Sequence, residues 1–326
     1  MTGAPLLDVR ALSVAATRSS GPPMPILADV SFSLVAGDTL GIVGESGSGK
    51  STLALALIGL LPDGMRARGT IAFEGIDLLT RSESDLCRIR GARIGMIFQE
   101  PLTALNPAMT VGRQIAEAAA LHRDLDRRSA RREALALLDR VRIPEAARRF
   151  DSYPHELSGG QRQRIGIAMA LAPGPDLLVA DEPTTALDVT VQAEVLDLLA
   201  ELVAERAMAL ILIGHDLGVV ACSTNRMLVL YAGTRFEAGP TRDVLLHPRN
   251  PYTRGLIGAL PRPRQGTERL ATIPGTVPST AQAFTGCRFA PRCVEHRTPC
   301  DAGEPAWRSF GDGRGVRCVL APEDAA

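Results

Sequence analysis

The sequence predicts an α/β fold, and three observations lead to this prediction. Strand-like and helix-like patterns alternate along residues 1–240, as they do in domains built on a mostly parallel sheet. A short apolar strand expected at 39–43 runs into a glycine-rich turn, and a helix expected at 50–61 follows. Between about 108 and 172 the pattern becomes entirely helical, which indicates a helical insertion inside the α/β domain.

The remaining elements follow from the same patterns. Buried strands are expected where short apolar runs lie between turn signals, at 93–98, 176–180, 209–213 and 226–231. Helical periodicity within the insertion appears at 111–122, 127–141 and 160–172. A region rich in Pro and Gly begins at 261, which is typical of a linker, and the last 40 residues are rich in turn-forming residues.

Composition excludes several classes of protein. The 36 basic residues balance the 36 acidic ones, so bulk charge gives no reason to expect a nucleic-acid partner. No run of about 18 apolar residues is present, so no transmembrane helix is expected, and no signal peptide is recognisable. We therefore expect the chain to stay in the cytoplasm, where its six cysteines would not form disulfides.

A phosphate-binding loop is the strongest local motif. Residues 44–51 read Gly-Glu-Ser-Gly-Ser-Gly-Lys-Ser, which matches G-x-x-x-x-G-K-[ST] between a strand and a helix. Lys50 is the single lysine of the chain and is expected to reach the β- and γ-phosphates of a nucleotide, while the Ser51 hydroxyl binds Mg²⁺. The residues expected to hold the nucleotide are Gly44, Glu45, Ser46, Gly47, Ser48, Gly49, Lys50, Ser51 and Thr52.

Two carboxylates end the apolar strand expected at 176–180. A buried strand followed by Asp181 is typical of a Mg²⁺-binding acid (Walker B) in phosphate-loop proteins. Glu182, one residue further, is placed to orient and deprotonate an attacking water. A strand followed by Asp-Glu is weak evidence for such a site when it occurs alone. Here it lies about 130 residues after a phosphate loop, which makes the evidence much stronger. The pair therefore predicts ATP hydrolysis.

The segment Leu157-Ser158-Gly159-Gly160-Gln161, at the start of a predicted helix, resembles the signature of the ATP-binding cassette (ABC) family. A Ser-Gly-Gly turn at a helix N-terminus offers N–H groups and a hydroxyl to an anion. In the family this turn faces the γ-phosphate of ATP held by the opposite subunit. The resemblance thus adds four residues to the expected ATP site: Ser158, Gly159, Gly160 and Gln161.

Three further positions resemble landmarks of that family. Gln99 resembles the Q-loop glutamine, which senses Mg²⁺ and the membrane subunit, so we expect it with Ser51 and Asp181 at the metal. Residues 186–188 resemble the D-loop, and His215 resembles the switch histidine that contacts the γ-phosphate. One position departs from the pattern. Where the family stacks an aromatic ring on adenine, this chain has Ala16.

The tail narrows the resemblance to one group. Segments 247–256, 286–293 and 99–107 resemble those of oligopeptide, dipeptide and nickel importers, and the likeness covers about residues 5–320. It implies a P-loop NTPase cassette at 1–260, with an N-terminal antiparallel β part and a helical signature subdomain at about 108–172. A small Cys-rich C-terminal extension is implied at 261–326.

The resemblance also implies a function. The chain would be an ABC-type ATPase that energises import of peptides or related small solutes, at the cytoplasmic face of the inner membrane. Its partners would be a second, non-identical ATPase subunit, two membrane-spanning permease subunits and an extracytoplasmic solute-binding protein. The alternative is a soluble ABC ATPase acting on DNA or the ribosome. Such proteins usually carry two cassettes or a long coiled coil, and this chain has one set of motifs and no heptad run.

Four cysteines lie within 32 residues of the tail, in a region with little apolar material for a core of its own. Small segments of that kind are usually stabilised by a covalent cross-link or a bound metal. The gaps of five, six and seventeen residues exceed the close pairs usual for zinc, whereas thiolates at loose spacing can hold a [4Fe–4S] cluster, as the resemblance also implies. Zinc, with His296 as a further ligand, and free thiols are the alternatives. The four residues are Cys287, Cys293, Cys300 and Cys318.

Overall fold

The structure is a computed structural model that describes residues 4–100, 104–185, 187–260, 272–278, 284–311 and 313–321. It divides into two compact units. The first unit comprises Met1–Leu34, Thr39–Leu79 and Ile213–Ala326, and the second comprises Val35–Asp38 and Thr80–Leu212. The domain boundary predicted at 260/261 stays a prediction, since residues 261–271 lie outside the described part of the chain.

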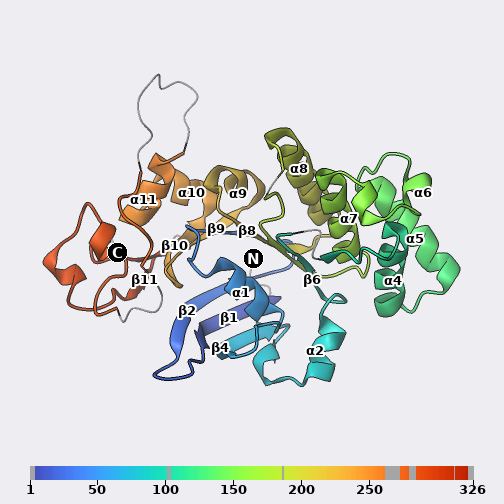
Figure 1. Cartoon of the computed structure of the whole chain (residues 1–326). Coiled ribbons are helices and arrows are strands. Elements are labelled where there is room, and N and C mark those ends of the chain that lie inside the picture. The colour runs from blue at the N-terminus through green and yellow to red at the C-terminus, as the bar shows by residue number, and fades with distance from the viewer. Residues whose placement is uncertain are drawn as a thin grey trace. The chain divides into compact units, whose positions relative to one another are not determined.

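The first unit contains the predicted N-terminal antiparallel sheet. Its strands are in the order β2-β1-β4-β5, with bounds β1 (Leu7–Ala16), β2 (Met24–Leu34), β4 (Met65–Phe73) and β5 (Ile76–Asp77). Figure 1 shows β1 between β2 and β4. The register of β1 against β4 shifts after Arg10, where Ala11 takes a positive φ of 46°. Gly69 lies opposite this irregularity, and a Cβ there would stand 2.6 Å from the Ala11 carbonyl oxygen. The close approach of the two backbones therefore requires glycine.

A second set of strands in the first unit has the order β11-β12-β10-β9-β3. The strands are β3 (Thr39–Val43), β9 (Arg226–Tyr231), β10 (Thr234–Pro240), β11 (Trp307–Ser309) and β12 (Gly315–Arg317). β3 and β9 are parallel, whereas β10 is antiparallel to both β9 and β12. The C-terminal extension thus adds two short strands to the sheet that contains β3.

The described residues of the first unit form the α-helices α1 (Lys50–Leu57), α9 (Leu217–Ser223), α10 (Thr241–Leu246) and α11 (Pro251–Gly258). Short 3₁₀ helices accompany them: η1 (Leu78–Thr80), η3 (Ala290–Arg292) and η4 (Thr298–Cys300). The prediction that the first helix runs to residue 61 was wrong. α1 ends at Leu57 because Gly59 adopts a left-handed conformation with φ of 65°, and a proline follows at 62.

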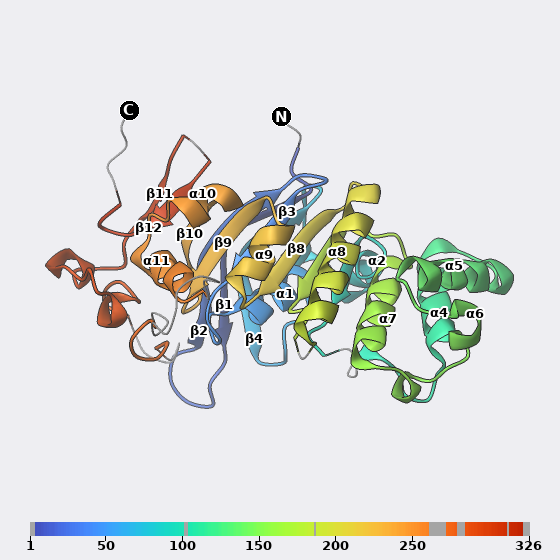
Figure 2. The ribbon, with the colours of Figure 1, turned by 90° about the horizontal axis from the view of Figure 1, so that it is seen from above.

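The second unit combines parallel strands with the helical insertion. β8 (Ala209–Gly214), β7 (Leu177–Asp181) and β6 (Ile94–Ile97) are neighbours, and β7 is buried throughout. Figures 1 and 2 show α4, α5, α6 and α7 gathered beside one another, which confirms the predicted helical insertion. The helices are α2 (Glu83–Ile89), α4 (Val111–Arg123), α5 (Arg127–Arg140), α6 (Ala146–Arg149), η2 (Pro154–Glu156), α7 (Gly159–Leu171) and α8 (Val189–Glu205). Among the described residues, no helix is both long and apolar enough to cross a membrane.

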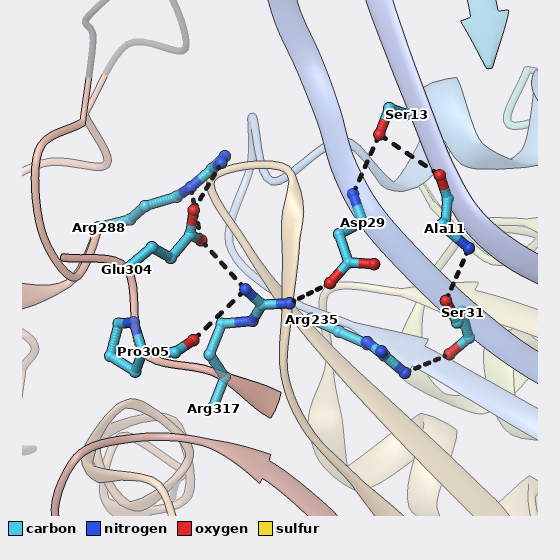
Figure 3. Close-up of polar contacts among 9 residues, drawn as sticks. All are labelled: Ala11, Ser13, Asp29, Ser31, Arg235, Arg288, Glu304, Pro305 and Arg317. Atoms are coloured by element: carbon cyan, nitrogen blue, oxygen red, sulfur yellow. Dashed lines mark hydrogen bonds and ion pairs between the residues drawn. The ribbon is translucent and has the colours of Figure 1, made fainter. Parts of the chain in front are cut away.

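The extension is fastened to the N-terminal sheet by buried arginines (Figure 3). Arg317 of β12 donates to Asp29 Oδ2 at 2.7 Å and to the Pro305 carbonyl at 3.4 Å. Arg288 pairs with Glu304 at 3.0 Å, and Glu304 also lies 3.7 Å from Arg317. Because both guanidiniums are mostly shielded from water, with side chains 8% exposed, these ion pairs are screened less than surface ones. The pair of Arg317 with Asp29 holds the tail against β2, while Glu304 joins the two arginines within the tail.

Candidate functional site

The loop between β3 and α1 is shaped by its glycines. Gly47 and Gly49 have φ of 79° and 95°, a region that L-residues rarely occupy, and α1 begins directly afterwards. Gly44 is needed for space, because a Cβ there would stand 2.2 Å from the Leu230 carbonyl oxygen. The loop therefore curls tightly around the N-terminus of a helix. Such a curl directs backbone N–H groups into one concavity, which suits an anion.

Lys50 lies inside this loop rather than in solvent. It is 5% exposed, and its ammonium donates to the Gly44 carbonyl at 2.8 Å and the Glu45 carbonyl at 3.1 Å. Ser48 is fully buried, and its hydroxyl oxygen has no hydrogen-bond partner among the described residues. A buried cation and an unsatisfied hydroxyl in one loop fit a polyphosphate that supplies oxygens to both.

Two side chains from the C-terminal part of the chain contact Glu45, and neither was predicted. The Tyr252 hydroxyl accepts the Glu45 backbone N–H at 3.0 Å. Arg292 donates to both carboxylate oxygens of Glu45, at 2.7 and 2.9 Å. Hydrogen bonding to this carboxylate raises the pKa of Arg292, and burial raises the pKa of Tyr252. No local pattern could reveal these contacts, because they join residues more than 200 positions apart.

In the second unit, the structure brings together two residues that were predicted to act in catalysis. Asp181 ends β7 and is 5% exposed, and Glu182 follows with a positive φ of 46°. The Gln99 amide donates to Glu182 Oε2 at 3.2 Å, and the Thr185 hydroxyl donates to the same oxygen at 2.9 Å. Thr185 was missed by the sequence analysis. The Glu182 carboxylate is therefore fixed by two donors at the end of a buried strand.

The predicted signature forms the N-terminus of α7. Ser158 is the N-cap: its hydroxyl accepts the Gln161 N–H at 3.3 Å, and Gln161 Oε1 accepts the Ser158 N–H at 3.1 Å. Ser158 and Gly159 are exposed. A Cβ at Gly160 would meet Val191 Cγ1 at 2.7 Å, so this glycine lets α7 approach α8 closely. The capping box gives the turn a fixed shape while leaving its outer side open to a partner.

The remaining predicted positions have definite local settings. His215 directly follows β8 and is exposed, and Asp216 caps α9 by accepting the Gly218 N–H at 2.9 Å. In the predicted D-loop, Ala186 lies outside the described residues, while Asp188 caps α8 by accepting the Val191 N–H at 3.0 Å. The catalytic and binding roles assigned to all these residues stay predictions.

Ala16, which replaces the family's aromatic residue, lies at the end of β1. Its register partners are Met24 on β2 and Met65 on β4, and both methionines are half-buried. Cross-strand partners present their side chains on the same face of a sheet. A polarizable thioether can contact an aromatic ring favourably. The two methionines are thus the side chains that flank the position where the sequence lacks an aromatic.

The four tail cysteines converge although their spacing is loose. All of them line one cavity of about 20 Å³, and none forms a disulfide. Burial raises the pKa of the Cys287 thiol to about 11, and Cys300 and Cys318 act in the same direction. However, no group of three or more His, Cys, Asp or Glu in the described part of the chain is arranged to hold a metal ion. His296, the predicted additional zinc ligand, contacts Asp301 at 3.0 Å.

Comparison with known proteins gives a consistent result. The family described as "ABC transporter" matches residues 27–185, and "Oligopeptide/dipeptide transporter, C-terminal region" matches residues 236–300. The oligopeptide transport ATP-binding protein OppD of Haemophilus influenzae is 46% identical over 98% of this chain and 98% of its own length. A Brucella abortus protein, provisionally named as a peptide import ATP-binding protein, is 49% identical over 97% of this chain and 95% of its own length.

Solved structures agree on the fold. CbiO1 of Clostridium perfringens, part of an ABC transporter complex, is similar with a TM-score of 0.64 and 26% identity, over 74% of this chain and 91% of that one. The dimeric ATP-binding cassette MJ0796 bound to ADP and Pi has a TM-score of 0.64 and 27% identity, over 72% of this chain and 99% of that one. The predicted ABC cassette fold is confirmed, and the chain belongs to the ABC transporter family, among the ATP-binding subunits with the oligopeptide/dipeptide C-terminal region.

Proposed function

We propose that this chain hydrolyses ATP to drive the import of peptides or related small solutes through membrane-spanning permease subunits. The observation that carries the proposal is the contact of Gln99 with Glu182 at the end of β7, which orients a carboxylate beside a buried aspartate. The likeness to OppD, over almost the full length of both chains, supports peptides as the solute class. The tail match to oligopeptide and dipeptide transporters supports the same class.

Each step of ATP binding and hydrolysis has a proposed residue. Lys50 and the loop N–H groups bind the β- and γ-phosphates, and Ser51, Asp181 and Gln99 are the proposed Mg²⁺ ligands. Glu182 activates the attacking water as general base. His215 contacts the γ-phosphate. Asp181 supports this scheme because it is a buried acid at a strand end, where Mg²⁺ offsets the cost of burying its charge.

The proposed working form is a dimer of two cassettes. The signature turn at Ser158 is exposed and pre-shaped by its capping box, so it can bind the phosphates of ATP held by a second subunit. The similar cassette MJ0796 is dimeric in its solved structure, which supports this arrangement. A second, non-identical ATPase subunit, two permease subunits and an extracytoplasmic solute-binding protein are the proposed partners, with the complex at the cytoplasmic face of the inner membrane.

A metal centre in the C-terminal extension is also proposed. Four thiols around one small cavity match a [4Fe–4S] donor set in kind and number, and zinc is the alternative. The raised thiol pKa values mean that metal binding must displace protons as it forms. Because no three or more such side chains in the described part of the chain are arranged to hold a metal ion, the thiols must shift when the centre assembles. Its proposed role is to hold residues 261–326 together as a small domain.

The direct test is transport. The chain would be co-expressed with the permease subunits and the partner ATPase, placed in vesicles, and supplied with the solute-binding protein and labelled peptides. ATP-dependent accumulation of peptide, lost when ATP is replaced by a non-hydrolysable analogue, is the expected result. ATP turnover that no peptide-loaded binding protein stimulates would contradict import, and failure of the complex to bind permease subunits would contradict a transporter role.

A further inference from the structure

Glu45, the second residue of the phosphate loop, is held at three points. Its N–H donates to the Tyr252 hydroxyl at 3.0 Å, its carbonyl accepts from the Lys50 ammonium at 3.1 Å, and its carboxylate pairs with Arg292. Tyr252 lies on α11, and Arg292 ends the short helix η3. Two of the three contacts therefore come from segments that follow the phosphate loop by more than 200 residues. Both residues lie in the first unit, with the loop itself.

The Arg292 side chain is held in place by contacts other than those with Glu45. Its side chain is only 4% exposed. Its Nε donates to the Pro274 carbonyl at 2.8 Å, and Nη1 donates to the Tyr231 hydroxyl at 3.3 Å. Nη2 also donates to the Gly275 carbonyl at 3.3 Å. Two further bonds go to the two Glu45 oxygens in a bidentate pair, the geometry in which a planar guanidinium binds a carboxylate best. The guanidinium is therefore a preformed clamp on the loop.

The contact between Arg292 and Glu45 affects nucleotide binding through the charge of the Glu45 carboxylate. Glu45 places a negative charge on the loop whose purpose is to hold the oxygens of a polyphosphate, and like charges in a partly shielded site repel. The Glu45 side chain is 28% exposed, so water screens this charge only in part. Arg292 neutralises the carboxylate and fixes its orientation. Without Arg292 the loop would be both less ordered and more negative.

Tyr252 supplies the second contact from a rigid position. It is fully buried, and its ring lies 4.6 Å from that of Tyr231, 5.9 Å from Phe236 and 5.3 Å from Phe289. Phe289 directly precedes η3, the helix that ends at Arg292. One aromatic cluster thus supports both contacts to the loop. A displacement of the extension would move both together.

We propose that Arg292 and Tyr252 are positioning residues for ATP binding, through which the C-terminal extension, together with α11, sets the shape and charge of the phosphate loop. Two of the tail cysteines lie next to Arg292 and η3. Cys293 follows Arg292 directly, and the Ala290 N–H of η3 donates to the Cys287 carbonyl at 2.9 Å. The cysteine cavity and the contact with Glu45 therefore share the short helix η3. This inference rests on the proposed binding of ATP by Lys50.

The test is the dissociation constant of a fluorescent ATP analogue with Mg²⁺, measured on the full chain and its variants. Arg292→Gln should weaken binding about tenfold, within the range usual for coupled sites. Adding Glu45→Gln to Arg292→Gln should recover most of the loss, because the unneutralised charge is removed. Tyr252→Phe keeps the ring packing and removes only the hydroxyl, so it should give a smaller loss. The dissociation constant of Arg292→Lys should lie between those of Arg292→Gln and the wild-type chain.

The matched control is Arg317→Gln. Arg317 is another buried arginine that fastens the extension, but it contacts Asp29 instead of the phosphate loop. It should lower the thermal unfolding temperature without changing the dissociation constant. Wild-type affinity in both Arg292→Gln and Tyr252→Phe would overturn the inference, as would a loss in Arg292→Gln that Glu45→Gln does not recover. A wild-type chain that binds no ATP would instead contradict the proposed function.

Discussion

Gln99 and Glu182 meet at the carboxyl end of β7, where the Gln99 amide donates to Glu182 Oε2 at 3.2 Å. The Thr185 hydroxyl donates to the same oxygen at 2.9 Å, so two side chains fix the orientation of the carboxylate. The positive φ of 46° at Glu182 turns the chain sharply after the strand. Such a conformation costs of order 1–3 kcal/mol and persists where surrounding contacts enforce it, as at functional sites.

Glu182→Gln should bind Mg-ATP normally and hydrolyse it about 10²–10⁴ times more slowly, because an amide cannot accept the proton of the attacking water. ATPase assays on the assembled complex, with the partner's catalytic site also disabled, measure this. Glu201→Gln is the matched control, since Glu201 lies on the exposed face of α8 and pairs with Arg142. Turnover close to the wild-type rate in the Glu182 variant would show that another group is the base.

Lys50 permits a chemical test without mutation. It is the single lysine of the chain, so an amine-directed label can modify only this side chain and the α-amino group. We expect slow labelling in the folded protein, because Lys50 is 5% exposed and bonded to two loop carbonyls. Saturating Mg-ATP should suppress it further, as measured by mass spectrometry. Labelling that does not respond to nucleotide would contradict contact with the phosphates, and labelling in denaturant is the control for reagent activity.

Ser158→Arg should leave ATP binding by this chain intact and block hydrolysis in the partner's site. The reason is that the exposed signature turn would carry a bulky side chain where a second subunit's phosphates are proposed to bind. Binding to the isolated chain and turnover by the complex separate the two effects. Leu121→Arg is the control, on an α4 residue that is 75% exposed. If the isolated chain hydrolysed ATP as fast as the complex, the two-subunit model would be wrong.

Local patterns predicted much of the fold. The bounds of β3 and β9 match the prediction, because short apolar runs between turns define buried strands. The bounds of β6 and β7 differ by one residue at each end, and those of β8 by one residue at its C-terminal end. The strands β11 and β12 were not predicted. They contain three residues each, too few for a period of two to be visible, and β12 forms only through its pairing with β10.

The site was predictable where a motif is contiguous and not where it depends on distant segments. The phosphate loop shows in eight consecutive residues. The clamp on Glu45 joins residues 247 positions apart, and nothing near Arg292 distinguishes it from the other arginines of the chain. The sequence indicated that the four cysteines come together, because they lie close to one another in a short tail. Nothing in the sequence indicated how the thiols are arranged around the cavity.

The tail centre has a test of its own. Protein purified without oxygen should be brown and contain about four irons and four labile sulfides per chain if the four thiols hold a [4Fe–4S] cluster. Cys300→Ser should abolish the colour, since Cys300 is the buried member of the set, whereas Cys222→Ser in α9 is the control that keeps it. Stoichiometric zinc without sulfide, or no metal at all, would contradict the proposal of an iron–sulfur cluster.

If the tail thiols hold a metal, removing it with a chelator tests the proposed link between the centre and the phosphate loop. Thiols around one cavity hold η3, so loss of the metal should lower the thermal unfolding temperature and weaken binding of the ATP analogue together. Arg292→Gln should bind ATP equally weakly with and without metal, because its clamp is already broken. A metal-free wild-type chain that melts earlier yet binds ATP with unchanged affinity would show that the extension stabilises the protein without acting on Glu45.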